Sequence, residues 1–296
     1  MKKFILPTLV LFLFITVSCD SGKSLTQTRQ TAQAAYNSGD YAKALELWEG
    51  IIKSYGKKSE EKQCPVYTEA GMAAMKLGQV EIAEQYLKQA SWGNLSTAET
   101  YLSLSELYKD KDNLSLELEN LETYAKKYPE GQDIGYVDMR LFKLYGEIGS
   151  YDKSLGFWNK LNSESQSGIE AQELLIKVYS GLGMNTEAVS RAKTILSTDP
   201  DNIAANKWLA NHYFWKAEKR YQKEMNIYKK KKTRKQYSHL LKVIDEVAIE
   251  FKQALKYGRK LYTLEPNQEN AKLLGNTYDR LNYKDKAKYY QGLGKK

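Results

Sequence analysis

The sequence predicts an all-α protein built from repeated pairs of antiparallel helices, and three observations support this. Of its 296 residues, 42% are hydrophobic and 27% charged, with only five prolines, which is the composition of a folded and largely helical chain. A pattern of turn, small and bulky residues recurs at intervals of 34 to 39 residues. Pro129, Pro200 and Pro266 fall where the second helix of a unit is expected to stop, because proline cannot continue a helix.

Residues 1–18 have the form of a secretory signal peptide. Two lysines precede an apolar run of fourteen residues, which is shorter than the roughly 20 residues that cross a bilayer as a helix. Ser18-Cys19 at the end of this run resembles the lipobox of bacterial lipoproteins, in which the cysteine is lipidated and becomes the new N-terminus. Thr16 departs from that pattern, since Leu, Val or Ile is usual there. The alternatives are cleavage to a soluble secreted form and an uncleaved anchor.

If Cys19 is lipidated, residues 19–25 form a lipid-anchored linker. The mature chain is then held at the bacterial cell envelope, at the outer membrane or the periplasmic face. The lipid itself supplies the contact with the membrane.

The recurring pattern extends over residues 26–294. Its turn residues are Gly39, Gly78, Asp112, Gly149, Gly183 and Asn282. The small or substituted residues that follow five positions later are Ala44, Ala83, Glu117, Ser154, Ala188 and Ala287. Small residues let two helices approach closely, and Tyr and Trp fill the space between neighbouring pairs. The pattern resembles the tetratricopeptide repeat family, whose unit is two antiparallel helices of about 34 residues. The resemblance implies a right-handed superhelical solenoid of about seven units.

The sixth unit is split by an insertion of about thirty-two residues. Its first helix has Ala210 and Tyr213 at the expected places, but the alanine and proline of its second helix come only at Ala254 and Pro266. Residues 216–250 contain no Pro or Gly, so the sequence predicts two lengthened helices that project as a basic hairpin.

The stretch YKKKKTRKQY is expected at or near the tip of this hairpin. Residues 216–242 hold eleven Lys or Arg against two Glu, whereas the net charge of the whole chain is only +9. The candidate residues for contact with an anionic partner are Lys229, Lys230, Lys231, Lys232, Arg234 and Lys235. A solvated helix surface and contact with an acidic envelope component or partner both remain open. Nucleic acid is disfavoured, because export separates the mature chain from cytoplasmic DNA and RNA.

The family resemblance also implies a groove lined by the first helices of the units. Peptide-binding members hold a C-terminal carboxylate with a Lys and an Asn four residues apart, and two consecutive units here match that spacing. The candidate groove residues are these two pairs and two neighbouring aromatics: Lys207, Asn211, Lys272, Asn276, Phe214 and Trp215. The other basic residues of the family pattern are not matched. An ordinary helix surface is therefore the alternative.

The sequence contains no motif that supports catalysis, a metal site or a cofactor. His212 and His239 are the only histidines, and neither lies near a cysteine pair or in an HExxH motif. The stretch starting at Asp110 begins like a calcium loop, but Ser115 replaces the required Gly and Leu121 the required Glu.

We therefore expect a noncatalytic scaffold or adaptor, without a cofactor, whose partner is another envelope protein or peptide. The alternative is an adhesion or surface-binding lipoprotein. In that case the basic protrusion would contact an anionic envelope polymer or lipid.

Overall fold

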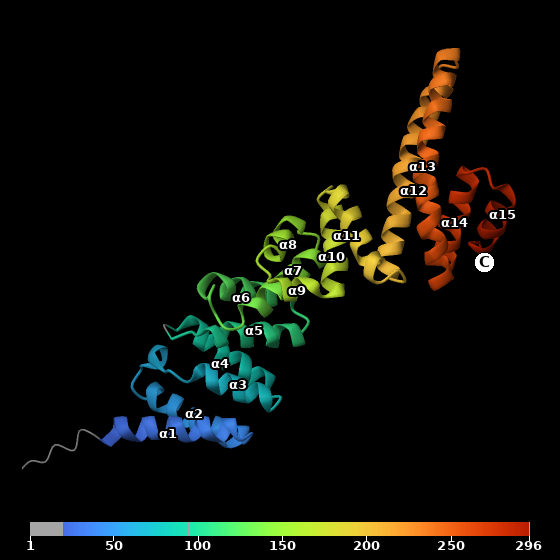
Figure 1. The fold of residues 1–296 in the computed structure, drawn as a ribbon. Helices are drawn as coiled ribbons and strands as arrows, with labels where there is room; N and C mark the ends of the chain where they lie inside the picture. Colours follow the sequence, from blue (N-terminus) through green and yellow to red (C-terminus); the bar gives the residue numbers. More distant parts are fainter. Residues whose placement is uncertain (1–19, 94, 296) are drawn as a thin grey trace, which may run out of the picture. The chain divides into compact units, whose positions relative to one another are not determined.

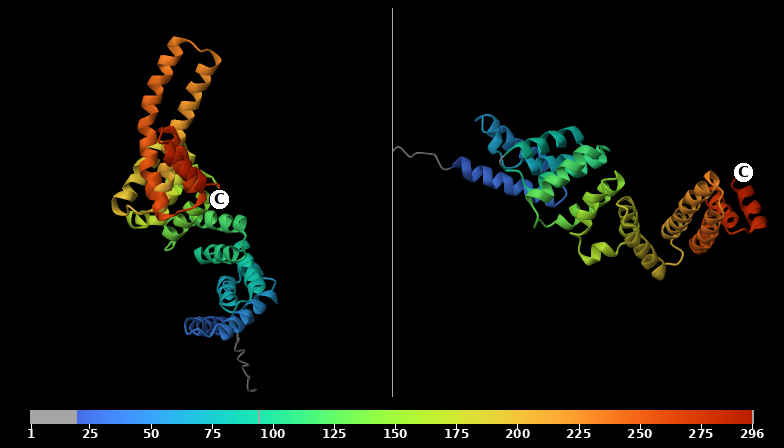
Figure 2. Two further views of the ribbon diagram at one scale, coloured as in Figure 1. Left: turned by 90° about the vertical axis from the view of Figure 1, so that its right-hand side faces the viewer. Right: turned by 90° about the horizontal axis from the view of Figure 1, so that it is seen from above.

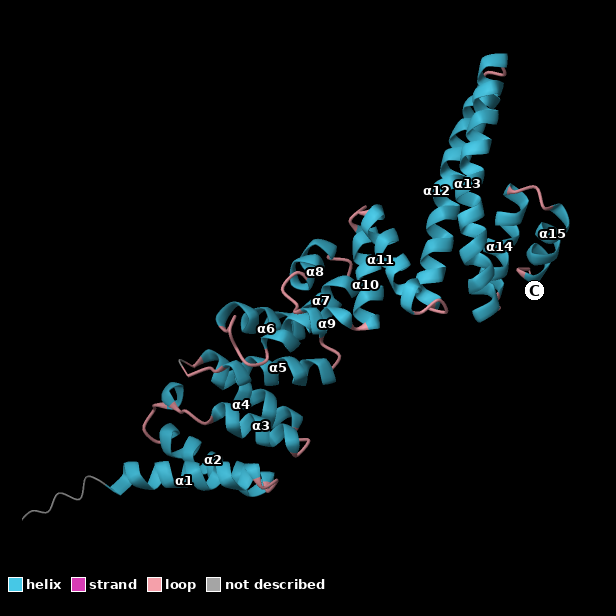
Figure 3. Cartoon of the chain, viewed as in Figure 1, coloured by secondary structure: helices cyan, strands magenta, loops and turns pink. Residues whose placement is uncertain are grey.

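A computed structural model describes residues 20–93 and 95–295, and helices joined by short turns make up this part of the chain (Figures 1 and 3). No strand occurs in these two ranges, so the all-α prediction is confirmed. Seven helix pairs follow one another: α1 (Asp20–Asn37) and α2 (Tyr41–Gly56), α3 (Tyr67–Lys76) and α4 (Val80–Trp92), α5 (Ala98–Asp110) and α6 (Leu114–Lys127), α7 (Ile134–Glu147) and α8 (Tyr151–Trp158), α10 (Ile169–Gly181) and α11 (Asn185–Thr198), α12 (Ile203–Lys230) and α13 (Arg234–Leu264), and α14 (Gln268–Arg280) and α15 (Lys284–Leu293). A short 3₁₀ helix, η1 (Glu61–Gln63), and a short helix, α9 (Ser163–Ser167), lie between pairs.

The predictions for residues 1–25 can be compared with the structure only from Asp20 onward. The signal peptide and Cys19 lie outside the described residues. Helix α1 begins at Asp20, so the segment predicted to be a linker after Cys19 is helical. Leu25, in this segment, packs against the buried core of the first hairpins.

The chain divides into two compact units, residues 1–137 and 138–296, and the division falls within α7. In the first unit, the hairpins α1/α2, α3/α4 and α5/α6 share one hydrophobic core. The predicted packing residues Ala44 and Ala83 are fully buried in it. A Cβ on Gly71 would lie 2.6 Å from Leu87 Cγ, so the two helices of the second hairpin approach as closely as a glycine permits.

Glu84 on α4 joins its own helix to the end of α5. Its carboxylate accepts hydrogen bonds from Lys111, Lys88 and the Tyr108 hydroxyl. The hydrogen bonds from the two lysines lower the pKa of Glu84 from 4.5 to about 2.

Replacing Glu84 by Gln should lower stability at neutral pH and not at pH 2. The folded-state pKa lies below the unfolded value, so the contribution is complete above about pH 4.5 and is lost as the pH falls to about 2. Solvent screens the two exposed lysines that pair with this half-buried carboxylate, and we expect a loss of about 1 kcal/mol at pH 7. Urea unfolding of both proteins at the two pH values measures it. An equal difference at pH 7 and pH 2 would contradict the assignment.

The second unit contains the remaining hairpins. Between α7 and α8, Phe142 and Trp158 pack with ring centroids 5.1 Å apart, and the Ser154 hydroxyl donates to the Phe142 carbonyl at 2.8 Å. Ala188 on α11 packs against α10 and α12, and Ala287 on α15 packs against α14. Both alanines are buried, as the repeat pattern predicts.

The predicted insertion is a long helical hairpin. α12 has 28 residues and α13 has 31, and residues 231–233 connect them. The hairpin rises beyond α14 and α15 in each view that shows it from the side (Figures 1 and 2). Phe214, Val243, Val247 and Phe251 form its core. The basic stretch lies at its tip, where all six candidate lysines and arginines are exposed.

Candidate functional site

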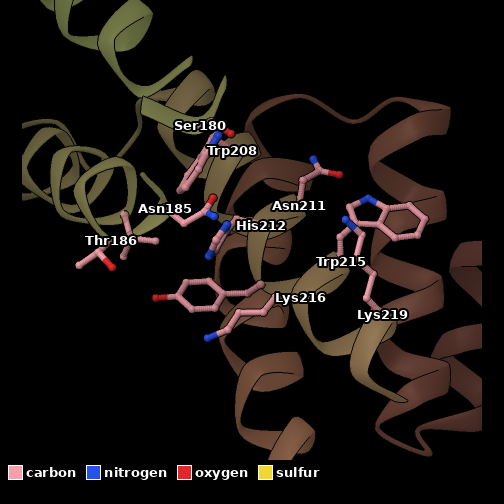
Figure 4. A pocket seen from close by; sticks show the side chains of 11 residues that line it. Ser180, Asn185, Thr186, Trp208, Asn211, His212, Trp215, Lys216 and Lys219 are labelled. Atoms are coloured by element: carbon pink, nitrogen blue, oxygen red, sulfur yellow. The ribbon is translucent and has the colours of Figure 1, made fainter. Parts of the chain in front are cut away.

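A pocket of about 780 Å³ lies in the second unit, between the α10–α11 turn and the base of the long hairpin (Figure 4). One face of α12 supplies six of its lining residues at helical spacing: Trp208, Asn211, His212, Trp215, Lys216 and Lys219. Ser180 from α10 and Asn185 and Thr186 from α11 line the opposite wall. An ordinary hairpin helix would end near Lys216, so the lengthening of α12 provides part of this wall.

Aromatic rings form much of the pocket surface. Trp208 and His212 are stacked, with ring centroids 4.7 Å apart and ring planes 14° apart. Both lie on the side of Asn185 and Thr186 in Figure 4, whereas Trp215 points to the other side. Trp215 is 53% exposed, which is a large apolar surface to leave in contact with water. The pocket therefore offers two separated aromatic surfaces to a ligand.

The charge of the pocket is positive. Lys216 Nζ lies 2.7 Å from Glu250 Oε1 on α13, while Lys219 has no ion pair within the described part of the chain. Burial, with help from the positive charge of Lys216, lowers the pKa of His212, so its imidazole is neutral at pH 7. No carboxylate is among the lining residues. This lining favours a ligand that carries acidic groups beside apolar ones.

Polar contacts fix the first turn of α12, the helix that forms most of the pocket wall. The Asn202 side chain caps the helix by accepting from the Ala205 backbone N–H at 2.9 Å. Asn206 donates to the Pro200 and Asn202 carbonyls at 3.1 and 2.8 Å. One turn further on, Leu209 is fully buried in the core that α12 shares with α10 and α11.

The turn beside the pocket repeats along the chain. Gly183 has a φ of +73°, a left-handed conformation that glycine adopts without strain. The other five turn positions predicted from the sequence have the same sign of φ, from +53° to +84°: Gly39, Gly78, Asp112, Gly149 and Asn282. All six small or substituted residues five positions after them are buried. The chain has the tetratricopeptide-repeat fold.

No protein-family profile matches the sequence, and no curated protein is similar to it at a significant level. Similar solved structures include a tetratricopeptide repeat protein from Parabacteroides merdae ATCC 43184, which is 15% identical over 92% of this chain and 94% of that one, with a TM-score of 0.46. The MamA protein is 20% identical over 60% and 93% of the two chains, with a TM-score of 0.45. A TPR repeats protein from Bacteroides fragilis NCTC 9343 is 16% identical over 86% and 98%, with a TM-score of 0.37.

The structure brings two of the six predicted groove residues, Asn211 and Trp215, into one pocket. Phe214 was expected beside them, and this prediction is wrong: Phe214 is only 4% exposed and packs on Phe251 of α13, with ring centroids 5.8 Å apart. The Asn211 amide donates to the Lys207 carbonyl at 2.9 Å, within its own helix. Lys207 itself points to α14, where its ammonium lies 3.1 Å from Glu269.

The second Lys-Asn pair lies on α14, away from the pocket. The Asn276 amide oxygen accepts from Gln291 of α15 at 3.4 Å. The end of α15 approaches Lys272 so closely that a Cβ on Gly294 would lie 3.1 Å from the Lys272 Cβ. The two pairs therefore do not line a common pocket. Whether either binds a chain end stays a prediction.

Sequence reasoning missed most of the pocket. Trp208, His212 and Lys219 share the face of Trp215 at spacings of four, three and four residues, which is a signal that the sequence does contain. Ser180, Asn185 and Thr186 line the pocket because the α10/α11 hairpin stacks beside α12, and this stacking leaves no local pattern in the sequence.

Two further pockets, of about 540 and 420 Å³, lie in the first unit and share Tyr36 and Met72. Arg29 and Glu69 form an ion pair at 2.8 Å in the larger one. No group of three or more potential metal ligands occurs among residues 20–93 and 95–295. None of the helices in those ranges is long and apolar enough to span a membrane.

Proposed function

We propose that this chain is a noncatalytic scaffold that binds an envelope protein or peptide through the pocket beside α12. The exposed Trp215, together with the stacked Trp208 and His212, carries the proposal. Large aromatic side chains are the residues that most often dominate binding energy at protein interfaces. The unpaired Lys219 adds a preference for an acidic ligand.

The test is a pull-down of envelope proteins by the full chain, comparing the parent with Trp215→Ala. Trp92→Ala is the matched control, since Trp92 is 72% exposed and lies outside the pocket. The proposal expects at least one protein that Trp215→Ala fails to recover and Trp92→Ala retains. Recovery of every bound protein by Trp215→Ala would contradict it.

We also propose that a lipid on Cys19 tethers the scaffold to the cell envelope. The support is the sequence alone: an apolar run of fourteen residues ends in Ser18-Cys19, where the chain turns from apolar to polar.

Replacing Cys19 by Ala is expected to release the chain from the membrane fraction or to leave its precursor unprocessed, because the cysteine is the residue that is lipidated in the lipobox pattern. Metabolic labelling with a fatty-acid analogue, followed by fractionation, measures this. Equal labelling of parent and variant would rule out lipid attachment at Cys19.

A second candidate function is adhesion to an anionic envelope polymer or lipid through the basic tip. The supporting observation is that none of the six tip residues, Lys229 to Lys232, Arg234 and Lys235, forms an ion pair with any residue that the structure describes. Their charges are available to an external partner.

Changing these six residues to Gln should leave the melting temperature nearly unchanged, because they are exposed and outside the hairpin core. The second candidate further expects that the variant loses envelope binding, and that the binding of the parent weakens between low and physiological salt. Recovery of envelope components at two ionic strengths measures both effects. Equal, salt-insensitive recovery by parent and variant would exclude adhesion through the tip.

A further inference from the structure

Helix α13 carries one continuous apolar stripe along most of its length. Two series of residues at seven-residue spacing form it: Tyr237, Ile244, Phe251 and Gly258, and Leu241, Ala248, Leu255 and Tyr262. The two series alternate at spacings of three and four residues, which places them on one side of the helix. Such a stripe is the surface that a neighbouring helix covers in a helical bundle.

Helix α14 covers the lower half of this stripe. Leu255 and Tyr262 pack against the cluster of Leu274 and Tyr278. Gly258 faces the same helix, because a Cβ there would lie 3.8 Å from Leu274 Cδ1. The lower half is therefore an ordinary contact between consecutive repeats.

The covering helix ends at Arg280. Its guanidinium binds both carboxylate oxygens of Glu218 at 2.6 Å and lies 4.8 Å from the ring centroid of Tyr221. The hairpin continues beyond this level, and only α12 lies beside α13 there (Figures 1 and 2).

The upper half of the stripe is left open to solvent. Tyr237 packs on Tyr228 of α12 with ring centroids 5.6 Å apart and is still 48% exposed; Leu241 is 44% exposed, and Ile244 and Ala248 are partly exposed. From Tyr237 to Ala248 the open part spans about 16 Å, or three helical turns. The sequence thus continues a helix-packing surface past the point where the chain itself provides a helix to cover it.

Basic residues surround this open surface at the tip. From Asn226 to Ala248 the chain contains seven basic residues, Lys229 to Lys232, Arg234, Lys235 and Lys242, against two carboxylates at the lower end, Asp245 and Glu246, of which Glu246 pairs with Arg220. All seven basic side chains are exposed. A polyanion alone would satisfy the charges but leave Tyr237 and Leu241 uncovered. An apolar helix with acidic flanks would complement both features.

We propose that the open upper half of the α13 stripe docks an amphipathic helix of a partner protein, with acidic residues beside its apolar face. The partner helix would lie where α14 would lie if it were longer. This surface extends the scaffold function to a second site, apart from the pocket, so Trp215→Ala should leave its binding unchanged. A failed docking test on α13 would therefore leave the pocket proposal standing, and a failed pocket test would leave the docking proposal standing.

The test uses the full chain and a fluorescently labelled synthetic helix of three heptads, with Leu at the apolar positions and Glu at the flanking ones. Two control peptides separate the contributions: one replaces the flanking Glu by Lys, and the other replaces the Leu by Ser. Fluorescence anisotropy gives the dissociation constants. We expect the first peptide to bind at least about tenfold more tightly than either control, because each control removes one half of the complementarity.

Leu241→Gln should weaken binding of the first peptide by about tenfold, since it places an amide in the docked apolar contact. Ile249→Gln is the matched control: Ile249 is on the same helix and 64% exposed, but it belongs to neither series. Circular dichroism of both variants checks that the helices are retained. Equal weakening by the two variants would contradict docking on the stripe.

Three other results would overturn the proposal. Equal binding of the Ser-substituted peptide would show a contact with negative charge alone. A dimer in sedimentation experiments that Leu241→Gln dissociates would show that a second copy of the chain covers the stripe. Binding to phosphatidylglycerol vesicles that depends on Leu241, without binding of the first peptide, would show a membrane surface as the occupant.

Discussion

Replacing Trp48 by Ala is expected to lower the free energy of unfolding by about 3–5 kcal/mol, the range for removing a buried Trp from a core. Trp48 lies on α2, is 1% exposed, and packs with Tyr36 at a centroid distance of 5.7 Å. Its indole N–H has no hydrogen-bond partner among the described residues, so the loss comes from packing. Urea denaturation, followed by far-ultraviolet circular dichroism, measures the change.

The same substitution at Trp92 is the control for this prediction. Trp92 is 72% exposed at the end of α4, and we expect its replacement to change stability by less than about 0.5 kcal/mol. A similar loss of stability from the two substitutions would contradict the burial of Trp48 in the core of the first unit.

Replacing Glu218 by Ala should be the second most damaging change, with an expected loss of about 2–3 kcal/mol. Burial alone would raise the pKa of Glu218, but hydrogen bonds from Arg280 and Gln222 outweigh it and lower that pKa. The bidentate pair with Arg280 joins the base of the long hairpin to the end of α14, and both side chains are mostly buried, at 12% and 27% exposure. Removing the carboxylate leaves the guanidinium with a weak contact to Asp279, at 3.6 Å, and with the ring of Tyr221, whose centroid is 4.8 Å away.

A double-mutant cycle with Arg280→Ala isolates the energy of this pair. We expect a coupling of at least about 1.5 kcal/mol, because a bidentate charge-assisted contact is stronger than an ordinary hydrogen bond. Purely additive losses would mean that the pair does not hold α14 to the hairpin.

The sequence predicts the hairpins well because each one depends on local chemistry. A left-handed turn residue and a small residue five positions later are both visible in the letters, and Gly39 and Ala44 illustrate this for the first hairpin. The long insertion was predictable for a similar reason, since an uninterrupted helical composition fills the excess length. Pro200 and Pro266 likewise lie two residues beyond the ends of α11 and α13.

The candidate site was less predictable, because it depends on which helix packs on which face. Phe214 and Trp215 are adjacent in the sequence, but lengthened α13 brings Phe251 against Phe214 and buries it, while Trp215 remains exposed. Lys207 was predicted from its spacing to Asn211, and the stacking of α14 gives it Glu269 as a partner instead. Such contacts between distant segments leave no local pattern in the sequence.

The proposal that Trp215 marks a protein-binding pocket is tested most directly by site-specific photo-crosslinking in intact cells. A photoreactive amino acid replaces Trp215 in one strain and Tyr289 in another; Tyr289 is a control of similar exposure, at 63%, on α15. We predict a protein adduct of defined mass from position 215 that position 289 does not form. The same adducts from both positions, or none containing protein at position 215, would contradict the account.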